Sequence, residues 1–425
     1  MRSGWRGEMS GGGAVTAEEH LRWILDRIPL LPVREAALAE SAGLVLAADV
    51  DSPLDLPLWD NSAMDGYAVR AVDLAGAGAD RPVTLRVIGE VAAGSPEDPR
   101  IGPGEAVRIM TGAPLPSSAD AVVPVEWTAG EDPADPWAEH EVRVLRAVEY
   151  GANVRRRGED VSAGTPIASA GDRLSAARIA GLAAAGVTRV RVRPRPRVAI
   201  LVTGSELRAP GEPLDRGQIP ESNSVLLRAL LAENGIEASR VLVSGDDAGA
   251  LAERLDRLGA STDVVITTGG VGPGRHDVVR IALEREPEVR AVRVAVRPGQ
   301  PQCVGRLTSG AWIFALPGNP VSAAVSFELF VRPALLHAQG RGEVERIRVP
   351  ARAAVAWRGA AGRLQVLPIR IEPVDGGLAC RPAVDPGGVS HAVGGHGSAD
   401  GYALVPAERG DVAAGETVDV ILVDR

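Results

Sequence analysis

Apolar residues near the start of the chain recur with the spacing of an α-helix. Residues 21–28 place their leucines and isoleucines on one face, and Thr16 and Glu19 just before them have the spacing of a capping box. After two prolines, an alanine-rich stretch over residues 33–43 predicts a second helix. Residues 1–15 are rich in Gly and Ser and are predicted to be a disordered leader.

The pattern changes at Pro53 to short alternating runs separated by Gly and Pro, which is typical of β-strands. These runs predict an independent β domain over residues 54–149, with strands near 83–87, 106–110, 121–125 and 141–145. A helical pattern returns over residues 174–185 and ends at a glycine. The β domain is therefore predicted to be inserted into a helical domain that comprises residues 16–53 and 150–192.

A proline- and arginine-rich joint at residues 191–200 leads into a pattern of continuous Val and Ile strands that alternate with helices. Such alternation predicts a three-layer α/β domain, a parallel-rich sheet covered by helices on both faces, over residues 195–342. Its strands are expected at 198–202, 238–243, 264–267 and 312–316, and its helices at 222–234, 248–258 and 321–339. β-like runs then return, and residues 346–425 are predicted to form a small β-barrel. The expected fold class is multidomain, with α/β and β units.

Composition narrows the chemistry that the chain can perform. Of its 425 residues, 55 are acidic and 46 basic, and the net charge of -9 argues against broad binding of nucleic acid. All the basic residues are arginine, which excludes a Walker-type P-loop and Schiff-base catalysis. Cys303 and Cys380 lack a CxxC spacing and predict neither a disulfide framework nor a zinc site, so a cytoplasmic location is expected. No apolar run is long enough for a membrane span.

Acidic residues and glycines are predicted to gather at one edge of the parallel sheet. Ligands bind such sheets at the carboxyl ends of the strands, where Glu206, Asp246 and Asp277 are expected. The loop before Asp277 is predicted to offer backbone amides to an anion at Gly269, Gly270 and Gly272. Three carboxylates would repel a phosphate unless a hard cation stood between them, which predicts Mg2+. Asp246 and Asp277 can equally cap the helices that follow them, and both roles can coexist.

A second anion site is predicted at the start of the last long helix of this domain. Asn319 can cap that helix and Pro320 suits its first position, so the helix N-terminus would attract an anion. Arg293 and Arg297 lie nearby in the predicted fold, and either could bind an oxyanion. A solvated charge on a strand edge is the commoner explanation for any single arginine.

Two further groups of polar residues lie outside the parallel sheet. The run DNSAMDGYA over residues 60–68 can present Asp65 to a ligand, or its carboxylates can cap local backbone amides. Thr111 ends a predicted strand of the β domain. The run RRRGED, which ends at Asp160, could form a solvated ion-pair loop.

Taken in order, seven runs resemble motifs of the MoeA family, the molybdopterin molybdenumtransferases, which are related to gephyrin-like proteins. The runs are DNSAMDGYA, MTGAP, RRRGED, TGSEL, TGGVGPGRHD, RPGQP and LPGNPVSA. The resemblance implies a homodimer of elongated subunits with the four domains described above, of which the α/β domain binds molybdopterin. It also implies insertion of molybdenum from molybdate into adenylylated molybdopterin, with Mg2+ as cofactor and release of AMP. The substrate would come from a molybdopterin adenylyltransferase-type protein.

The resemblance also assigns roles to particular residues. Family acidic positions match Asp65, Asp160, Glu206, Asp246 and Asp277, and the family threonine of the β domain matches Thr111. The last motif contributes Pro317, Asn319, Pro320 and Ser322. In the family the site lies where the α/β domain of one subunit meets the β domain of the other. Asp65 and Thr111 are therefore expected to close the site from the partner subunit.

The chain departs from the family pattern in two places. The family has lysines near Arg293, Arg297 and Gln300. The two arginines keep the positive charge of a lysine but differ from it in shape, and Gln300 has no charge. The glycine loop reads VGPG where VSxG is usual, which removes a hydroxyl. Two other functions stay open at this point. One is a molybdopterin adenylyltransferase, for which a lone α/β domain is typical, and the other is a gephyrin-like scaffold without enzymatic activity.

Overall fold

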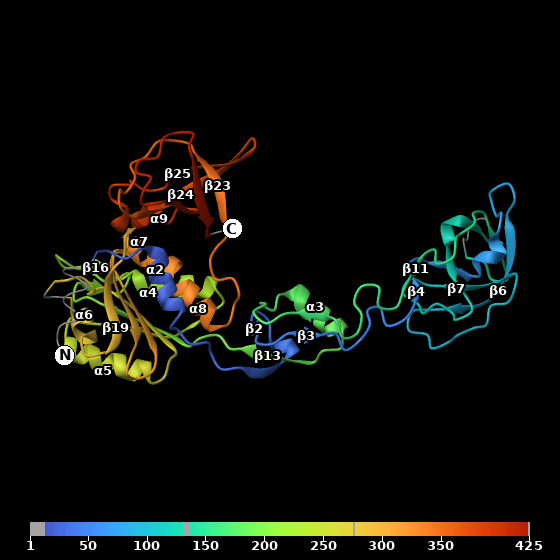
Figure 1. The fold of residues 1–425 in the computed structure, drawn as a ribbon, viewed down its shortest axis with the longest axis horizontal. Coiled ribbons are helices and arrows are strands. Elements are labelled where there is room, and N and C mark those ends of the chain that lie inside the picture. Colours follow the sequence, from blue (N-terminus) through green and yellow to red (C-terminus); the bar gives the residue numbers. More distant parts are fainter. Residues whose placement is uncertain (1–12, 131–136, 275–276, 424–425) are drawn as a thin grey trace.

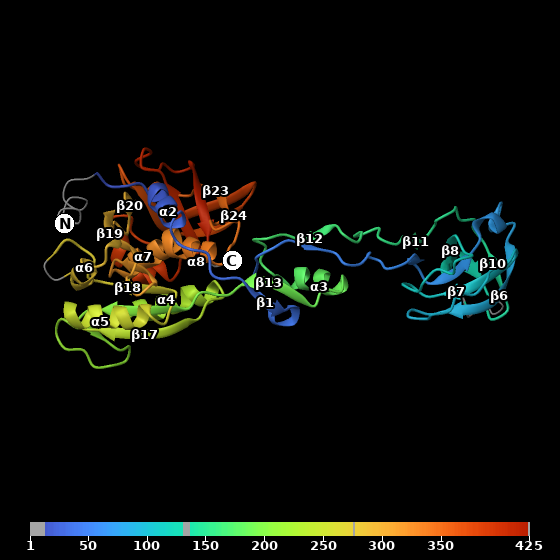
Figure 2. The same ribbon diagram turned by 60° about the horizontal axis from the view of Figure 1, so that its bottom comes forward.

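The computed structural model describes residues 13–130, 137–274 and 277–423. They form an elongated molecule (Figures 1 and 2). The α/β unit and the C-terminal barrel lie together at one end, a small unit that contains α3 lies in the middle, and the inserted β unit lies at the other end. The chain crosses the middle twice, once toward the inserted β unit and once on its return.

Helix α2 (Ala17–Leu25) begins as the sequence predicts. The Thr16 hydroxyl accepts a hydrogen bond from the amide of Glu19, whose carboxylate accepts one from the amide of Thr16, which completes the capping box. The buried face of α2, which includes Ile24, packs against the long helix of the α/β unit. Helix α2 is therefore part of the α/β end of the molecule (Figure 2).

The alanine-rich stretch after α2 is not the helix that its composition predicts. Arg34–Ala37 form strand β1, and only Leu38–Glu40 make a turn of 3-10 helix. Both β1 and β2 (Val45–Leu46) pair antiparallel with β13 (Arg189–Arg193). Pairing with a distant strand thus overrides the helix preference of alanine.

The middle unit combines two segments that are far apart in the sequence. Strand β3 (Val50–Asp51) pairs with β12 (Pro166–Ala168), and α3 (Ala176–Ala184) covers a small apolar core that includes Leu46 and Leu182. The unit contains more strand than the sequence suggests, because the predicted second helix is replaced by β1.

The inserted β unit contains a six-stranded sheet with the order β8-β5-β7-β6-β10-β9. Its strands are β5 (Gly66–Val69), β6 (Val83–Val91), β7 (Glu105–Ile109), β8 (Ala121–Pro124), β9 (Thr128–Ala129) and β10 (Glu141–Val144). The short strands β4 (Asn61–Ser62) and β11 (Val154–Arg155) pair beside it. Tyr67 and Ala68, which alternate along β5, enter two different apolar clusters, so both faces of the sheet are covered. The four strands predicted from alternating runs are confirmed.

The α/β unit is built on a second six-stranded sheet, with the order β17-β14-β18-β22-β21-β19. The strands are β14 (Val198–Thr203), β17 (Ala238–Ser244), β18 (Val264–Thr268), β19 (Glu288–Arg293), β21 (Pro301–Arg306) and β22 (Trp312–Leu316). The first three and β22 run parallel, as predicted, whereas β21 and β19 add an antiparallel edge. A small pair, β15 (Leu207–Arg208) and β16 (Ile219–Pro220), lies beside the sheet.

Helices cover both faces of this sheet. The helices are α4 (Asn223–Glu233), α5 (Ala248–Gly259), α6 (Val278–Leu283), and the continuous α7 (Pro320–Ser326), π-helical turn (Phe327–Val331) and α8 (Arg332–Ala338). Ile200 of β14 shares an apolar cluster with α4, α7 and α8, and its neighbour Leu201 shares one with α5 and α6. By length and composition, the helix from α7 to α8 is apolar enough to cross a membrane. However, 83% of its apolar 18-residue stretch is buried inside the protein.

The C-terminal strands close into a barrel. They are β23 (Arg348–Ala353), β24 (Leu364–Val374), β25 (Gly377–Pro382), β26 (Gly401–Val405) and β27 (Thr417–Leu422), and β24 pairs with β26 as well as β25. Short helical turns at Val389–His391 and α9 (Val393–His396) pack against α7. Strand β20 (Val296–Arg297) of the α/β unit pairs with β24, so the barrel and the α/β unit share a sheet.

Candidate functional site

The loops at the carboxyl ends of β14, β18 and β22 surround a cavity of about 730 Å3. This is the edge of a parallel sheet at which ligands bind. Nine of the residues that the sequence singles out line it: Glu206, Asp246, Gly269, Gly270, Gly272, Asp277, Pro317, Asn319 and Pro320. One cavity therefore contains residues that the sequence assigns to two separate sites.

The carboxylate of Asp277 holds the glycine loop. It accepts hydrogen bonds from the amide of Gly272 and from the amide of Gly274, both at 2.7 Å. From the other side, Arg280 donates to the carbonyl of Gly272 at 3.0 Å and to that of Gly274 at 3.3 Å. Asp277 stands at the N-cap position of α6 but makes no side-chain hydrogen bond to that helix. Its carboxylate binds the loop instead of capping α6.

The glycine amides are less available than the sequence suggests. The amide of Gly269 donates to the carbonyl of Leu316 at 3.1 Å, and that of Gly272 is bonded to Asp277. Gly270 has a φ of 61°, a backbone conformation that favours glycine, and its amide bonds to none of the described residues. Of the three predicted anion-binding glycines, Gly270 is the one that the described structure leaves open to a ligand.

Asp246 joins two loops of the cavity and does not cap a helix. Its carboxylate accepts a hydrogen bond from the amide of Ser205 at 3.0 Å. The cap of α5 is the neighbouring Asp247, which accepts a bond from the amide of Ala250 at 2.6 Å. The alternative role predicted for Asp246 thus belongs to the next residue in the chain.

The three carboxylates do not form the three-ligand magnesium cluster that the sequence predicts. Glu206, Asp246 and Asp277 line one cavity, yet no group of three or more His, Cys, Asp or Glu side chains in the described ranges could hold a metal ion. Both oxygens of Asp277 already accept loop amides, whereas Glu206 and Asp246 are exposed to the cavity. Mg2+ is often held by one or two carboxylates together with substrate phosphates, so the donor chemistry of these two residues still fits it.

Two polar residues of the cavity were missed by the sequence reading. Asn223 donates from Nδ2 to the carbonyl of Gly318 at 2.7 Å and to the hydroxyl of Thr268 at 3.2 Å. Glu221 is 5% exposed and accepts bonds from the amide and the hydroxyl of Ser224. Both belong to the polar run ESNS at the start of α4, which is the signal that could have identified them.

Three predicted residues of the α/β unit lie outside the cavity. Arg293 donates to the side chain of Gln300 at 3.3 Å, and Arg297 donates to the carbonyl of Gly387 in the barrel segment at 2.9 Å. Ser322 is 3% exposed. None of the described lining residues is an arginine, so the cavity is acidic where the sequence predicts nearby cations.

Asp65 and Thr111 meet in the inserted β unit. The Asp65 carboxylate accepts hydrogen bonds from the amide of Thr111 at 2.7 Å and from its hydroxyl at 2.8 Å. The backbone bond, and then the hydroxyl bond, lowers the pKa of Asp65 below its usual value. Both residues are exposed, so the pair presents an ionised carboxylate and a hydroxyl at the surface.

The arginine-rich run beside them forms ion pairs, which was one of its two interpretations. Arg156 donates to Asp60 at 2.6 Å, and the amide of Arg157 donates to the same carboxylate at 2.8 Å. The Arg157 guanidinium pairs with Asp55 at 2.6 Å. Asp160 is exposed at the end of this run. These bonds tie the run to residues 55–60, on the opposite passage of the chain.

The two groups of predicted residues lie at opposite ends of the molecule (Figures 1 and 2). Asp65, Thr111 and Asp160 belong to the inserted β unit and its attachment, whereas the cavity belongs to the α/β unit. One copy of the chain therefore does not bring them together.

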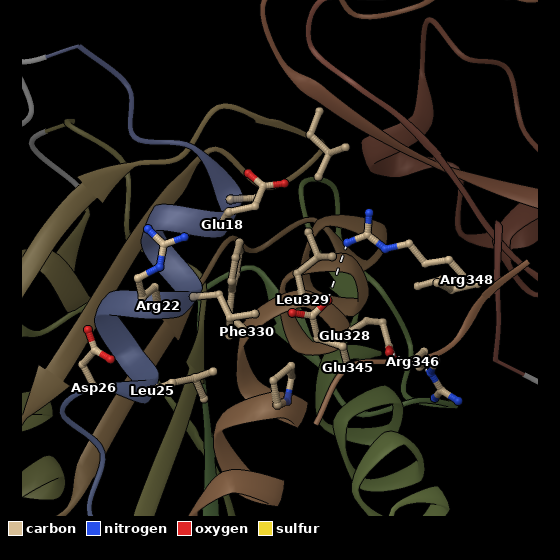
Figure 3. Close-up of a pocket in the computed structure, with 15 residues that line it drawn as sticks. Glu18, Arg22, Leu25, Asp26, Glu328, Leu329, Phe330, Glu345, Arg346 and Arg348 are labelled. Carbon is tan, nitrogen blue, oxygen red and sulfur yellow. Dashed lines mark hydrogen bonds and ion pairs between the residues drawn. The ribbon is translucent and has the colours of Figure 1, made fainter. Parts of the chain in front are cut away.

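A smaller cavity of about 360 Å3 lies between α2, the π-helical turn and the barrel (Figure 3). Leu21, Leu25 and Phe330 form its apolar wall, and the Glu328 carboxylate at its edge accepts a bond from Arg346 at 2.7 Å. It contains none of the predicted site residues. We therefore regard the cavity at the strand ends as the candidate site.

Comparison with known proteins identifies matches along nearly the whole chain. Residues 15–186 match the MoeA N-terminal region (domain I and II), residues 199–337 match a probable molybdopterin binding domain, and residues 350–423 match the MoeA C-terminal region (domain IV). The three matches follow the order expected from the seven sequence motifs.

Individual relatives agree with these matches. Molybdopterin molybdenumtransferase 1 of Mycobacterium tuberculosis (strain ATCC 25618 / H37Rv) is 38% identical over 412 residues, which cover 92% of this chain and 94% of the relative. Molybdopterin molybdenumtransferase 2 of the same strain is 42% identical over 331 residues, or 76% of this chain and 80% of the relative. The crystal structure of a molybdopterin biosynthesis MoeA protein from Pyrococcus horikoshii OT3 has a TM-score of 0.81 at 29% identity, and covers 97% of this chain and 100% of that one.

Proposed function

Because this chain belongs to the MoeA family, we propose that it is a molybdopterin molybdenumtransferase of molybdenum cofactor biosynthesis. It inserts molybdenum from molybdate into adenylylated molybdopterin and releases AMP. The observation that carries this proposal is the cavity at the strand ends, where carboxylates and a glycine loop occur together. A lone adenylyltransferase domain and a scaffold are not favoured, since the similarity to the mycobacterial transferase extends over 92% of the chain.

In this proposal the backbone of the cavity binds the phosphates of the substrate. The amide of Gly270 and the first turn of the helix that begins at Pro320 supply donors and partial positive charge. Ser322 belongs to that first turn, and its side chain is buried, so its part in the site is through the backbone of the turn. Asp277 and Arg280 hold the glycine loop in the shape that the ligand meets.

Glu206 and Asp246 are the residues that would hold Mg2+ beside those phosphates. When bound, Mg2+ would offset the charge of the pyrophosphate and make AMP a better leaving group. Without a cation, the carboxylates of the cavity would repel an anionic substrate, since no arginine lies among the described lining residues. The acidic lining thus supports a metal-dependent reaction.

Two copies of the chain complete the site. Asp65, Thr111 and Asp160 of one subunit face the cavity of the other in a cytoplasmic homodimer, which receives its substrate from an adenylyltransferase-type protein. The elongated shape supports this arrangement, because it keeps the two groups of residues apart within one copy (Figure 1). The family resemblance, which places the site between subunits, supports it as well.

The test is to incubate the purified protein with adenylylated molybdopterin, molybdate and Mg2+, and to follow AMP release together with activation of a cofactor-free molybdoenzyme. Both signals are expected to rise together and to disappear when Mg2+ is chelated. AMP without active cofactor would identify a hydrolase, and neither signal would leave the scaffold as the better description. Asp65→Asn is expected to abolish both signals with an unchanged circular dichroism spectrum, because Asn keeps an oxygen that can accept both hydrogen bonds from Thr111.

A further inference from the structure

A third cavity, of about 580 Å3, lies at the opposite end of β22 from the proposed site. Pro317, which follows the last residue of β22, lines the proposed site, whereas Trp312 at the first residue of the strand lines this cavity. We call it the arginine–tryptophan cavity. Its defining residues come from α2 and the turn after it, and from strands β19, β21 and β22. They are Trp23, Arg27, Arg290, Arg306 and Trp312.

Two of its arginines stack on one indole. The Cζ atom of Arg290 lies 3.8 Å from the ring centroid of Trp23, and that of Arg27 lies 4.7 Å from it. A guanidinium that stacks on an aromatic face is held in place while its N–H edge stays available for hydrogen bonds to an oxyanion. Trp23 therefore fixes two positive charges at the wall of the cavity.

The third arginine belongs to a row across the sheet. Arg306 of β21 stands opposite Glu288 of β19 on one side and opposite Trp312 of β22 on the other. Within the described ranges Arg306 forms no ion pair, and its one side-chain bond reaches the carbonyl of Gly310 at 3.4 Å. Glu288 is the one acidic residue among those that line the cavity.

The two stacked arginines have different neighbours. Arg27 makes one side-chain bond among the described residues, to the carbonyl of Trp23 at 3.4 Å, and no ion pair. Arg290 contacts Nδ1 of His20 at 2.8 Å. Burial, and then the charge of Arg290, lowers the pKa of His20 to about 3, so the imidazole is neutral at pH 7. The cavity thus gathers three guanidiniums and one carboxylate in a chain whose net charge is -9.

We propose that the arginine–tryptophan cavity binds a phosphate monoester whose organic part is flat and apolar. The guanidiniums bind the phosphate through charge-assisted hydrogen bonds. The apolar floor, formed by Trp312 and the two prolines of the lining, accepts the organic part. The volume of about 580 Å3 lies in the range of small-molecule sites and exceeds what a bare phosphate fills. This inference does not depend on the proposed function, since it concerns the other end of the sheet.

Phenyl phosphate is a suitable probe, and titration calorimetry measures its binding. We expect the double variant Arg27→Gln/Arg306→Gln to bind it on the order of tenfold or more weakly, since two charged hydrogen-bond donors are lost. The melting temperature should fall only slightly, because both guanidiniums make long bonds to carbonyls and the variant loses the one stacking contact of Arg27 on Trp23. The affinity should also fall as salt is raised.

The matched control removes two arginines from another hollow. Arg254 and Arg257 line a cavity of about 370 Å3 together with Arg240 and two leucines, without any aromatic residue among the described lining. Arg254→Gln/Arg257→Gln is expected to bind phenyl phosphate as tightly as the unchanged protein. If the first double variant does not fold, Arg306→Gln alone serves, since Arg306 is exposed at the end of β21.

Three results would overturn the proposal. They are no binding of phenyl phosphate to the unchanged protein at millimolar concentration, equal affinity in the Arg27/Arg306 variant, or an equal loss in the control variant. Inorganic phosphate and phenol test the two halves of the ligand separately, and each should bind more weakly than phenyl phosphate. Equal binding of inorganic phosphate would contradict the role of the apolar floor.

Discussion

Asn223 joins two loops of the candidate site with one buried amide. Its two hydrogen bonds reach Thr268 at the end of β18 and Gly318 in the loop after β22. The backbone segments approach so closely there that a Cβ added at Gly318 would lie 3.3 Å from the Cα of Gly269. Asn223→Ala should leave the Gly318 carbonyl without its side-chain partner, at a cost of about 1–3 kcal/mol. We expect a lower melting temperature and a higher KM for the adenylylated substrate. Unchanged values of both would show that the loops are positioned without Asn223.

Asp65 and Thr111 allow a pH-dependent prediction. Hydrogen bonds from Thr111 lower the pKa of Asp65, so the ionised carboxylate stabilises the fold. This stabilisation is fully present at neutral pH and is lost as the pH falls through the lowered pKa. Thr111→Val removes the hydroxyl bond but keeps the backbone amide, and it should raise the pKa of Asp65 part of the way toward its usual value. An NMR titration of the Asp65 carboxyl carbon measures this. A pKa that does not move would assign the whole shift to the backbone amide.

At the scale of elements, the glycine loop between β18 and α6 is held by two charged side chains. Arg280→Gln should weaken its bonds to the carbonyls of Gly272 and Gly274. Amide hydrogen exchange over residues 269–274 should become faster and the substrate KM should rise, with little change in melting temperature. Arg285→Gln is the matched control, because it also removes a charge near α6 but pairs with Asp256 and with the buried Glu286, neither of which belongs to the loop. A loop that exchanges equally fast in both variants would contradict the role given to Arg280.

Strand β5 depends on a glycine that directly follows Asp65. A Cβ at Gly66 would lie 2.0 Å from the carbonyl oxygen of Val123 on the neighbouring strand, whereas one at Gly89 in β6 meets nothing within 4 Å. Gly66→Ala should therefore destabilise the inserted β unit by roughly 1–3 kcal/mol through strain, and Gly89→Ala should have little effect. Thermal unfolding of the two variants compares them. Equal melting temperatures would show that β8 can move aside without loss.

The elements that the sequence predicts well are those whose pattern agrees with their surroundings. The parallel strands were found because Val198–Thr203 and Val264–Thr268 begin with continuous runs of apolar residues and are buried on both faces. Strand β1 was missed because its alanines favour helix locally and pair with β13 only in the folded chain. Glycine-rich amides were expected to be open, but Gly269 and Gly272 find partners within the fold that no local pattern contains. Asn223 was missed for the same reason, since its role depends on two loops distant in sequence.

For the whole molecule, the two groups of site residues predict a subunit-exchange result. Asp65→Asn and Asp246→Asn should each inactivate the proposed enzyme, one at the inserted β unit and the other at the cavity. In a two-fold dimer, coexpression of the two variants should restore about a quarter of the activity, because half of the dimers are mixed and each of these has one intact site. Coexpression of Asp246→Asn with Glu206→Gln is the control and should restore nothing. Absence of complementation in the mixed pair would place the site within one copy, and complementation in the control would show that Glu206 and Asp246 act in different sites.

The double crossing of the middle unit has a consequence for how the molecule comes apart. The outgoing and returning passages are joined by the pairing of β3 with β12 and by the bonds of Arg156 and Arg157 to residues 55–60. A protease that nicks either passage would leave both fragments bound to each other through the remaining one. Release of the inserted β unit therefore requires two cuts. After a single cut, the protein should elute from a sizing column as an intact particle, and its two fragments should separate on a denaturing gel.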